Sequence, residues 1–305
     1  MVKNVIYSFD SERSKRTAVC HAEGSFRSAL NHTARRVEAY HPRVITLSGP
    51  SCSGKTTTAD TVITRLTDGG MRVRQISIDD FYRENTLGRD YTDEEKKEQD
   101  WETFASIDGD YLRSFISGLL DGKKVERPVY DFARNRRTAF ETIDPNDYDV
   151  FLFEGIQALY PEVTAMLGEK RGYLSVFISV ASDLNVNGSF FTGRELRFLR
   201  RLVRDYRSRG ASAELTFSMW DKVVDNEKKN IEPYSAGTDL HLNSMMPYGP
   251  CVMKDEALSL LSMIGKDSVW YPKARSLAER LEPLPELENE YVPEDSVFRE
   301  FIGKS

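Results

Sequence analysis

The chain has 305 residues, enough for one large domain or two small ones. Its composition, with 40% apolar and 30% charged residues, is typical of globular proteins. Its net charge of −6 argues against a nucleic-acid-coating surface, because such a surface needs a basic excess. No run approaches the roughly 18 apolar residues of a membrane span, and the polar N-terminus lacks the apolar core of a signal peptide.

Residues 1–40 do not follow the strand–helix alternation of the rest of the chain. Residues 2–9 alternate weakly, as in a strand, and a helix is predicted over Phe26–Tyr40 with its cap near Ser25. The sequence therefore predicts an N-terminal extension over residues 1–40.

Alternating strands and helices begin at Arg43. Buried-strand patterns occur at residues 43–48, 71–79, 148–153 and 173–180. A helix that ends at Gly69 follows the first of them, with its apolar residues at i, i+3, i+4 and i+7: Ala59, Val62, Ile63 and Leu66. This order predicts an α/β fold, a mostly parallel sheet of about five strands with helices on both faces.

A glycine-rich segment joins the first strand to the first helix. It matches the eight-residue phosphate-loop pattern and consists of Gly49, Pro50, Ser51, Cys52, Ser53, Gly54, Lys55 and Thr56. Its glycines let the backbone curl so that N–H groups face phosphate oxygens, and the new helix adds its positive end. We expect Lys55 between the β- and γ-phosphates of ATP and the Thr56 hydroxyl on Mg²⁺, in a P-loop NTPase-type sheet. An ordinary glycine turn is the alternative, and Cys52 is interpreted as a small filler rather than a reactive thiol.

Two acidic residues stand at the ends of predicted strands. Asp79 ends the second strand, where a carboxylate faces the crevice in which ligands bind, so it is the candidate general base. The alternative is that Asp79 or Asp80 caps the next helix. Glu154 follows the apolar run 150–153 in a Walker-B-like arrangement and is the candidate Mg²⁺ ligand with Thr56.

Seven arginines lie between Arg194 and Arg209 on a predicted lid helix of about residues 194–210. At 100° per residue, one face carries four of them and the opposite face is mostly apolar. The arginines are Arg197, Arg200, Arg201 and Arg204, and the opposite face has Leu199, Leu202, Val203 and Tyr206. A solvated face and a nucleic-acid contact are alternatives, but a lid that clamps phosphates is favoured because guanidinium donors match anionic oxygens.

Together these motifs resemble the uridine kinase and phosphoribulokinase group of P-loop kinases, from about Arg43 to the end of the chain. SIDDFYR (77–83) resembles their acid-bearing strand end, VYDF (129–132) their nucleoside-binding segment, and LFEGI (152–156) their metal-binding segment. RRLVRDY (200–206), continuing to 210, resembles their lid helix. The resemblance implies Asp79 as base, Thr56 and Glu154 on Mg²⁺, Arg201 near the nucleoside, and Arg204 and Arg209 on phosphates.

The C-terminal half is similar to the bacterial uridine kinase-like proteins, on the segments 219–220, 227–231, 242–244 and 296–303. Those often carry an N-terminal TGS module, for which the first 40 residues here are too few. Uridine kinases place an Asp where Glu102 stands and a His where Asn135 stands. The implied acceptor pocket therefore consists of Glu102, Tyr130, Asn135 and Arg201.

We expect residues 41–245 to form the kinase-like domain and 246–305 a C-terminal helical extension and tail packed on it. The predicted activity is ATP-dependent, Mg²⁺-assisted phosphorylation of the 5′-hydroxyl of a nucleoside, uridine or cytidine. Alternatives are a kinase for another small hydroxyl acceptor, such as a sugar phosphate or vitamin precursor, and a nucleotide-binding regulator without turnover. A GTPase is disfavoured because the Asn-Lys-x-Asp motif is missing.

The expected partner is a small-molecule substrate, with no nucleic acid and no membrane, and a homo-oligomer is left open. Cys20, Cys52 and Cys251 are too few and too scattered for a disulfide framework or a zinc site. The expected location is therefore the reducing cytoplasm. The segment 83–100 is charged and predicted to be an exposed insertion or lid, and residues 283–294 a tail that wraps the surface.

Overall fold

A computed structural model describes residues 1–85, 92, 95, 101–131, 134–168 and 173–303. The predicted insertion at 83–100 lies mostly outside these residues. Five parallel strands form the central sheet in the order β10-β7-β2-β6-β3. They are β2 (Val44–Ser48), β3 (Val73–Ser77), β6 (Val150–Glu154), β7 (Tyr173–Ser179) and β10 (Leu240–Asn243). The predicted α/β fold of P-loop NTPase type, with about five parallel strands, is confirmed.

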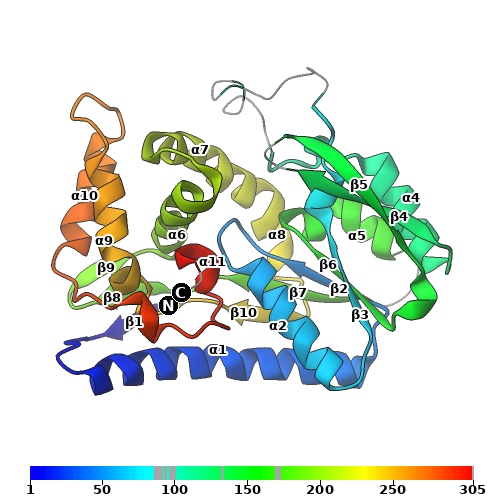
Figure 1. The fold of residues 1–305 in the computed structure, drawn as a ribbon, viewed down its shortest axis with the longest axis horizontal. Helices are drawn as coiled ribbons and strands as arrows, with labels where there is room; N and C mark the ends of the chain where they lie inside the picture. Colours follow the sequence, from blue (N-terminus) through cyan, green and yellow to red (C-terminus); the bar gives the residue numbers. More distant parts are fainter. Residues whose placement is uncertain (86–91, 93–94, 96–100, 132–133, 169–172, 304–305) are drawn as a thin grey trace.

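Helices cover both faces of this sheet, which explains why β2 and β6 are buried at every position (Figure 1). One face packs in a cluster with Ile45 and Leu152, under α1 (Glu12–Tyr40), α2 (Lys55–Asp68), α6 (Gly193–Arg209) and α9 (Gly249–Ser262). The other packs Val44 and Phe151 under α4 (Gly109–Leu120) and α5 (Pro161–Gly168). Strands β4 (Val125–Asp131) and β5 (Arg136–Ile143) form an antiparallel hairpin beside α4.

Helix α1 begins at Glu12, so the predicted start near Ser25 is wrong. Ser11 is its cap, because the Ser11 side chain accepts from the Ser14 amide and the Ser14 side chain accepts from the Ser11 amide. The buried side chains along α1 include Val19 and Phe26. Before it, β1 (Val2–Val5) pairs in parallel with β8 (Asp183–Val186), which pairs with β9 (Ser189–Phe191). The first 40 residues therefore pack on the same body as the sheet.

After α6 the chain continues through α7 (Ala213–Asn226), a π-helical turn (Glu227–Ile231) and α8 (Glu232–Ser235). Helices α9 and α10 (Tyr271–Leu281) pack together, and the following tail returns across the body to α11 (Arg299–Ile302), which contacts α6. The tail at 283–294 buries Leu284, Leu287 and Val292. Within the described part of the chain, no helix is both long and apolar enough to cross a membrane.

Candidate active site

The phosphate loop lies between β2 and α2, and two of its glycines are required by geometry. Gly54 has φ of 91°, in the left-handed region that favours glycine. A Cβ on Gly49 would lie 2.0 Å from the carbonyl oxygen of Ile178, closer than atoms can approach. The loop therefore has the backbone that the sequence motif predicts.

Three consecutive loop carbonyls are held from outside the loop. Ser51 O accepts from Arg197 at 3.1 Å, Cys52 O from Arg200 at 3.4 Å, and Ser53 O from the Ser244 hydroxyl at 2.6 Å. In a trans peptide the N–H points opposite to the carbonyl, so the amides of Cys52 and Gly54 face the other way. These contacts turn the loop's N–H groups toward the place of a bound phosphate.

The first turn of α2 supplies the cation of the loop. The Lys55 ammonium donates to Gly49 O at 3.0 Å and Pro50 O at 3.2 Å, so it lies across the loop. The first amides of the helix, starting at Lys55, have no acceptor within the helix and add to the positive end. A phosphate bound here would meet both the ammonium and these amides.

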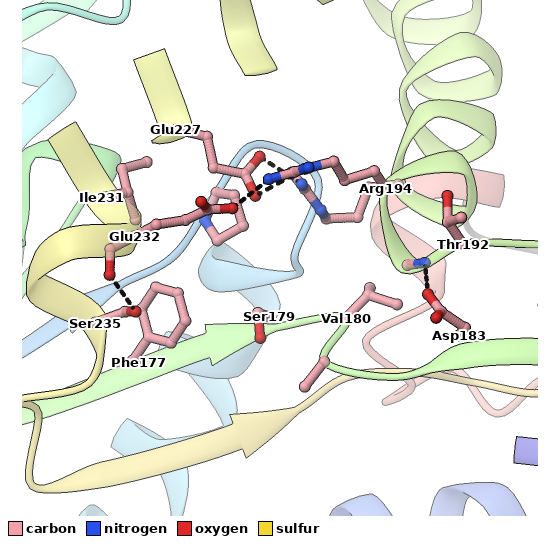
Figure 2. A pocket seen from close by; sticks show the side chains of 14 residues that line it. Phe177, Ser179, Val180, Asp183, Thr192, Arg194, Glu227, Ile231, Glu232 and Ser235 are labelled. Carbon is pink, nitrogen blue, oxygen red and sulfur yellow. Dashed lines mark hydrogen bonds and ion pairs between the residues drawn. The ribbon is translucent and has the colours of Figure 1, made fainter. Parts of the chain in front are cut away.

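A cavity of about 440 Å³ flanks the loop on the β7 side (Figure 2). Its lining includes Pro50 of the loop, Ser179 at the end of β7, and Arg194 at the start of α6. Arg194 forms ion pairs with Glu232 and, at 3.8 Å, with Glu227 across this cavity. The predicted catalytic carboxylates are not part of its lining.

The two residues predicted to hold Mg²⁺, Glu154 and Thr56, are in contact. The Thr56 hydroxyl donates to Glu154 Oε1 at 2.8 Å, and the Ser77 hydroxyl lies 3.5 Å from Oε2. A hydroxyl beside a carboxylate fits Mg²⁺, which takes a few protein oxygens and completes its shell with phosphates and water. Among the described residues no three His, Cys, Asp or Glu side chains gather around one point, and Glu154 is the acidic group in contact with Thr56.

The pKa of Glu154 is raised to about 7. Burial is the largest cause and the neighbouring Asp79 adds to it, while Lys55 and the Thr56 hydrogen bond oppose it. A cation at this position would relieve the charge that burial penalises. The site therefore favours a bound positive ion when Glu154 is ionised.

Asp79 lies where β3 ends and a short 3₁₀ turn (Ile78–Phe81) begins. Burial raises its pKa to about 6; Lys55 opposes this and Glu102 adds to it. Its Oδ1 atom is shielded from solvent and, within the described chain, has no hydrogen-bond partner. No side chain caps this turn, and Asp80 instead accepts from the Tyr130 amide at 3.3 Å and pairs with Arg127. Asp79 is thus the acid that is left available to a ligand.

Helix α6 crosses the phosphate loop with its arginine face inward, so the solvated-face alternative is wrong for this face. Arg197, Arg200 and Arg201 are 2%, 2% and 5% exposed. The apolar side is buried too, except that Tyr206, which was placed on it, is 46% exposed. Both faces are covered because α6 lies between the loop and the helices that follow it.

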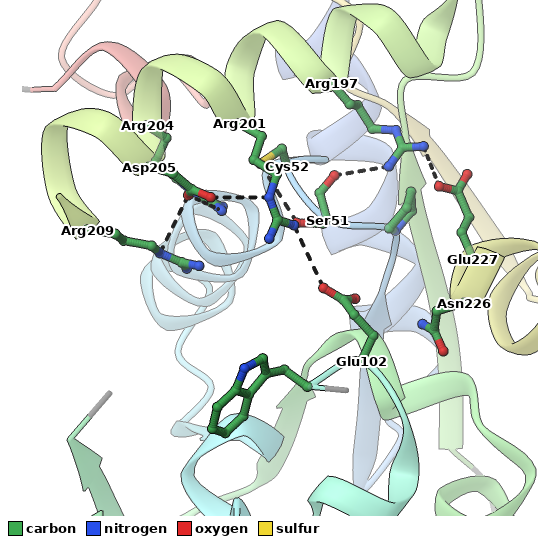
Figure 3. A network of polar contacts seen from close by, with 12 residues as sticks. Ser51, Cys52, Glu102, Arg197, Arg201, Arg204, Asp205, Arg209, Asn226 and Glu227 are labelled. Atoms are coloured by element: carbon green, nitrogen blue, oxygen red, sulfur yellow. Dashed lines mark hydrogen bonds and ion pairs between the residues drawn. The ribbon is translucent and has the colours of Figure 1, made fainter. Parts of the chain in front are cut away.

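Asp205 joins three of the predicted lid arginines (Figure 3). It pairs with Arg201 at 3.1 Å, Arg204 at 2.7 Å and Arg209 at 3.6 Å. Burial alone would raise the pKa of Asp205, but these arginines outweigh burial and hold the pKa below its ordinary value. Asp205 is therefore shared by three arginines, and Glu102 and Glu300 lie farther off, at 3.8 Å from Arg201 and 3.9 Å from Arg204. The guanidinium donors that Asp205 does not use can meet an anion.

The predicted acceptor residues are brought together only in part. Glu102 lies 3.8 Å from Arg201, whose guanidinium also donates to the Ser51 hydroxyl, so these two predicted residues meet at the loop. Tyr130 is buried and its hydroxyl donates to Arg83 O at 3.2 Å, while its ring packs on Tyr82. Asn135 is buried, and its backbone adopts the left-handed conformation with φ of 50°. Its backbone carbonyl accepts a hydrogen bond from the backbone N–H of Asn85.

Sequence patterns did not single out Ser244, Val297 or Glu300, yet all three touch the loop or the first turn of α2. Ser244 bonds Ser53 O, Val297 packs against Gly54, and Glu300 lies 3.4 Å from the Thr57 hydroxyl. The segments 242–244 and 296–303 were noted only as points of resemblance. No local pattern marks a residue whose partner is 243 positions away.

The chain is similar to known proteins over the region that holds this geometry. The model of the Phosphoribulokinase / Uridine kinase family matches residues 44–248. Uridine-cytidine kinase B of Dictyostelium discoideum is 31% identical over 217 residues, 68% of this chain and 76% of that protein. A uridine kinase of Deinococcus deserti is 31% identical over 223 residues, 72% of this chain and 94% of that protein.

Among solved structures, a possible uridine kinase from Bacillus stearothermophilus is 20% identical, with a TM-score of 0.41. It covers 50% of this chain and 80% of its own. The observed sheet order and the family match, and not this similarity, establish the fold. The family match ends before residues 249–303, which contain the tail that touches the loop.

Proposed function

The chain belongs to the phosphoribulokinase and uridine kinase family, and from this membership we propose that it transfers the γ-phosphate of ATP to the 5′-hydroxyl of a nucleoside, uridine or cytidine. The observation that carries the proposal is Asp79 at the end of β3, with one shielded carboxylate oxygen left without a partner in the described chain. Asp79 lies near Lys55 and Glu154, because Lys55 lowers the pKa of Asp79 and Asp79 raises the pKa of Glu154.

In the proposed reaction Asp79 accepts the proton of the attacking hydroxyl. A pKa of about 6 suits this role, since the group is ionised at neutral pH yet basic enough to take a proton. Thr56 and Glu154 would hold Mg²⁺, which supplies charge neutralisation on the phosphates when bound.

Charge on the transferring group would be stabilised by Lys55 from the loop and by Arg204 and Arg209 from α6. These arginines are held in place by Asp205 before any ligand arrives, so little reorganisation is needed. Because the transition state of phosphoryl transfer is loose, such positioning contributes most of the rate.

The choice of a pyrimidine nucleoside is supported by the relatives, which are uridine and uridine-cytidine kinases by name. Within this chain, Glu102 with Arg201 offers an acceptor and donors beside the loop, a pair that can bind sugar hydroxyls. Ribonucleosides are therefore proposed to be preferred over 2′-deoxynucleosides.

An assay of ADP release with uridine, cytidine, deoxyuridine, adenosine, guanosine and several sugar phosphates at equal concentration tests the proposal. Uridine or cytidine should give the highest initial rate. Turnover with a sugar phosphate or a purine nucleoside alone would reject the acceptor assignment and keep the kinase. Nucleotide binding without turnover on any acceptor would favour a regulator.

A further inference from the structure

The C-terminal segment Ser296–Gly303 is built into the body of the protein. Its apolar side chains Val297, Phe298, Phe301 and Ile302 are each at most 2% exposed. Arg299 donates to the carbonyls of Asn289, Val292 and Pro293, so the backbone before the segment is fixed as well. Side chains this buried belong to the core of a fold, whereas a loosely attached tail would leave its apolar side chains partly exposed.

Arg200 connects this segment to the phosphate loop. Its guanidinium lies over the rings of Phe298 and Phe301, at 5.1 and 4.9 Å from their centres. The same group donates to Cys52 O in the loop and, at 2.7 Å, to Ser244 O after β10. A single buried side chain therefore ties the C-terminal segment to the loop.

The segment also touches the first turn of α2 directly. A Cβ on Gly54 would lie 2.3 Å from a methyl carbon of Val297, so the segment leaves room only for glycine there. Glu300 Oε2 lies 3.4 Å from the Thr57 hydroxyl, and Glu300 Oε1 lies 3.9 Å from Arg204. The Glu300 carboxylate thus stands at the edge of the phosphate site.

The two threonines at the start of α2 show which end of a bound nucleotide meets this edge. Successive helix residues point about 100° apart, so Thr56 and Thr57 face different directions. Thr56 faces Glu154, on the side of Asp79 where the γ-phosphate must react, and Thr57 faces Glu300. A triphosphate that extends from the Thr56 side, with its γ-phosphate there, would carry its nucleoside toward Thr57 and the C-terminal segment.

The chemistry of Glu300 selects among the groups of that nucleoside. An ionised carboxylate only accepts hydrogen bonds, and it would repel a phosphate oxygen. The ribose 2′- and 3′-hydroxyls are donors that every ribonucleotide carries next to its phosphates. Arg204 lies 3.9 Å from one oxygen of Glu300 and the Thr57 hydroxyl 3.4 Å from the other, and a carboxylate has about four lone-pair sites, so sites remain for such donors.

We propose that the segment Ser296–Gly303 forms one wall of the donor-nucleotide site and that Glu300 accepts a hydrogen bond from the ribose of the donor. This inference rests on the proposed function only in requiring a nucleoside triphosphate as donor. It extends the donor site beyond the region 44–248 that the family match covers.

The test is calorimetric titration of the full chain, without acceptor, using ATP, 2′,3′-dideoxy-ATP and inorganic tripolyphosphate. Glu300→Gln keeps the shape and removes the charge. A hydrogen bond to a charged group contributes enough for the ATP dissociation constant to rise roughly 10-fold or more. Binding of dideoxy-ATP and tripolyphosphate should stay unchanged, and the wild-type protein should bind dideoxy-ATP about as weakly as the variant binds ATP.

Asp295→Asn is the matched control, since Asp295 precedes the segment and makes a surface pair with Arg27. It should leave all three affinities unchanged. Glu300→Asp, which shortens the side chain, should weaken the binding of ATP alone, and thermal melts of each variant establish folding.

Tighter binding of all three ligands by Glu300→Gln would show that the carboxylate faces phosphates. Unchanged binding of ATP by this variant would show that the carboxylate faces solvent. Either result overturns the proposal. A wild-type chain that binds no nucleotide would instead reject the proposed function.

Discussion

Asp79 and Glu154 are carboxylates that the fold makes costly to ionise. Their pKa values, about 6 and about 7, lie above ordinary carboxyl values of about 4, and burial is the main cause in both. A carboxyl pKa raised in the folded state stabilises the fold below the unfolded pKa and loses that stabilisation as the pH rises through the folded pKa. The nucleotide-free protein should therefore lose stability between about pH 4 and pH 7.

Glu154→Gln isolates this effect because Gln keeps the size of the side chain and cannot ionise. At pH 8 the variant should be more stable than the wild type by up to about 3 kcal/mol, since one pKa unit corresponds to about 1.4 kcal/mol. At pH 4 the two proteins should be equally stable. Urea unfolding at both pH values measures this, and an equal difference at both would show that the carboxyl is not the cause.

Asp79→Asn separates the two acids that follow β3. We expect kcat to fall by roughly 10²–10⁴ with ATP affinity nearly unchanged, because the variant loses only the proton acceptor. Asp80→Asn is the control: Asp80 holds the Tyr130 amide and Arg127, so its loss should lower the melting temperature and leave most of kcat. Near-normal turnover of the Asp79 variant, measured by ADP release, would exclude it as the base.

Helix α6 shows, at the scale of an element, what a local pattern can and cannot predict. Its arginine and apolar faces follow from spacing alone, and its observed bounds, Gly193–Arg209, lie within a residue of those predicted. That both faces are buried could not be predicted, because it depends on the loop on one side and helices on the other. Strand β10 was missed for a similar reason: its four residues are too short a pattern without the neighbouring β7.

The start of α1 is a second example. Gly24 and Ser25 look like a break and a cap, yet the helix continues through them from Ser11. Phe26 and Leu30 on one side of these residues and Val19 on the other are buried in the same core. Packing of a 29-residue helix outweighs a cost of about 1 kcal/mol for one glycine.

Arg204→Lys tests whether the position of α6 over the loop matters for chemistry. Lysine keeps the charge but loses the planar pair of donors. We expect kcat to fall roughly 10–100-fold with little change in the acceptor KM, as expected for a group that acts in the transition state. Arg207→Lys, on the same helix and paired with Glu256, should change kcat little. Equal effects of the two variants would indicate a structural role.

At the scale of the whole molecule, the C-terminal tail is a stabilising part of the kinase body. Phe298→Ala should lower the free energy of unfolding by about 3–5 kcal/mol, because it empties a fully buried site under Arg200 and Tyr248. Phe140→Ala, at a β5 residue that is 58% exposed, should change it by no more than about 0.5 kcal/mol. Urea unfolding measures both, and similar values for the two would show that the tail packs too loosely to matter.

The contact between Thr57 and Glu300, 243 positions apart, sets an order of events during synthesis. At about 5–20 residues per second, the ribosome exposes the glycine-rich loop roughly 12–50 seconds before the residues that brace it. Throughout that interval the nascent chain has the loop sequence but not Phe298 and Phe301 beneath Arg200. A chain truncated before residue 296 would therefore have the glycine-rich loop without the segment that packs on Gly54 and Arg200.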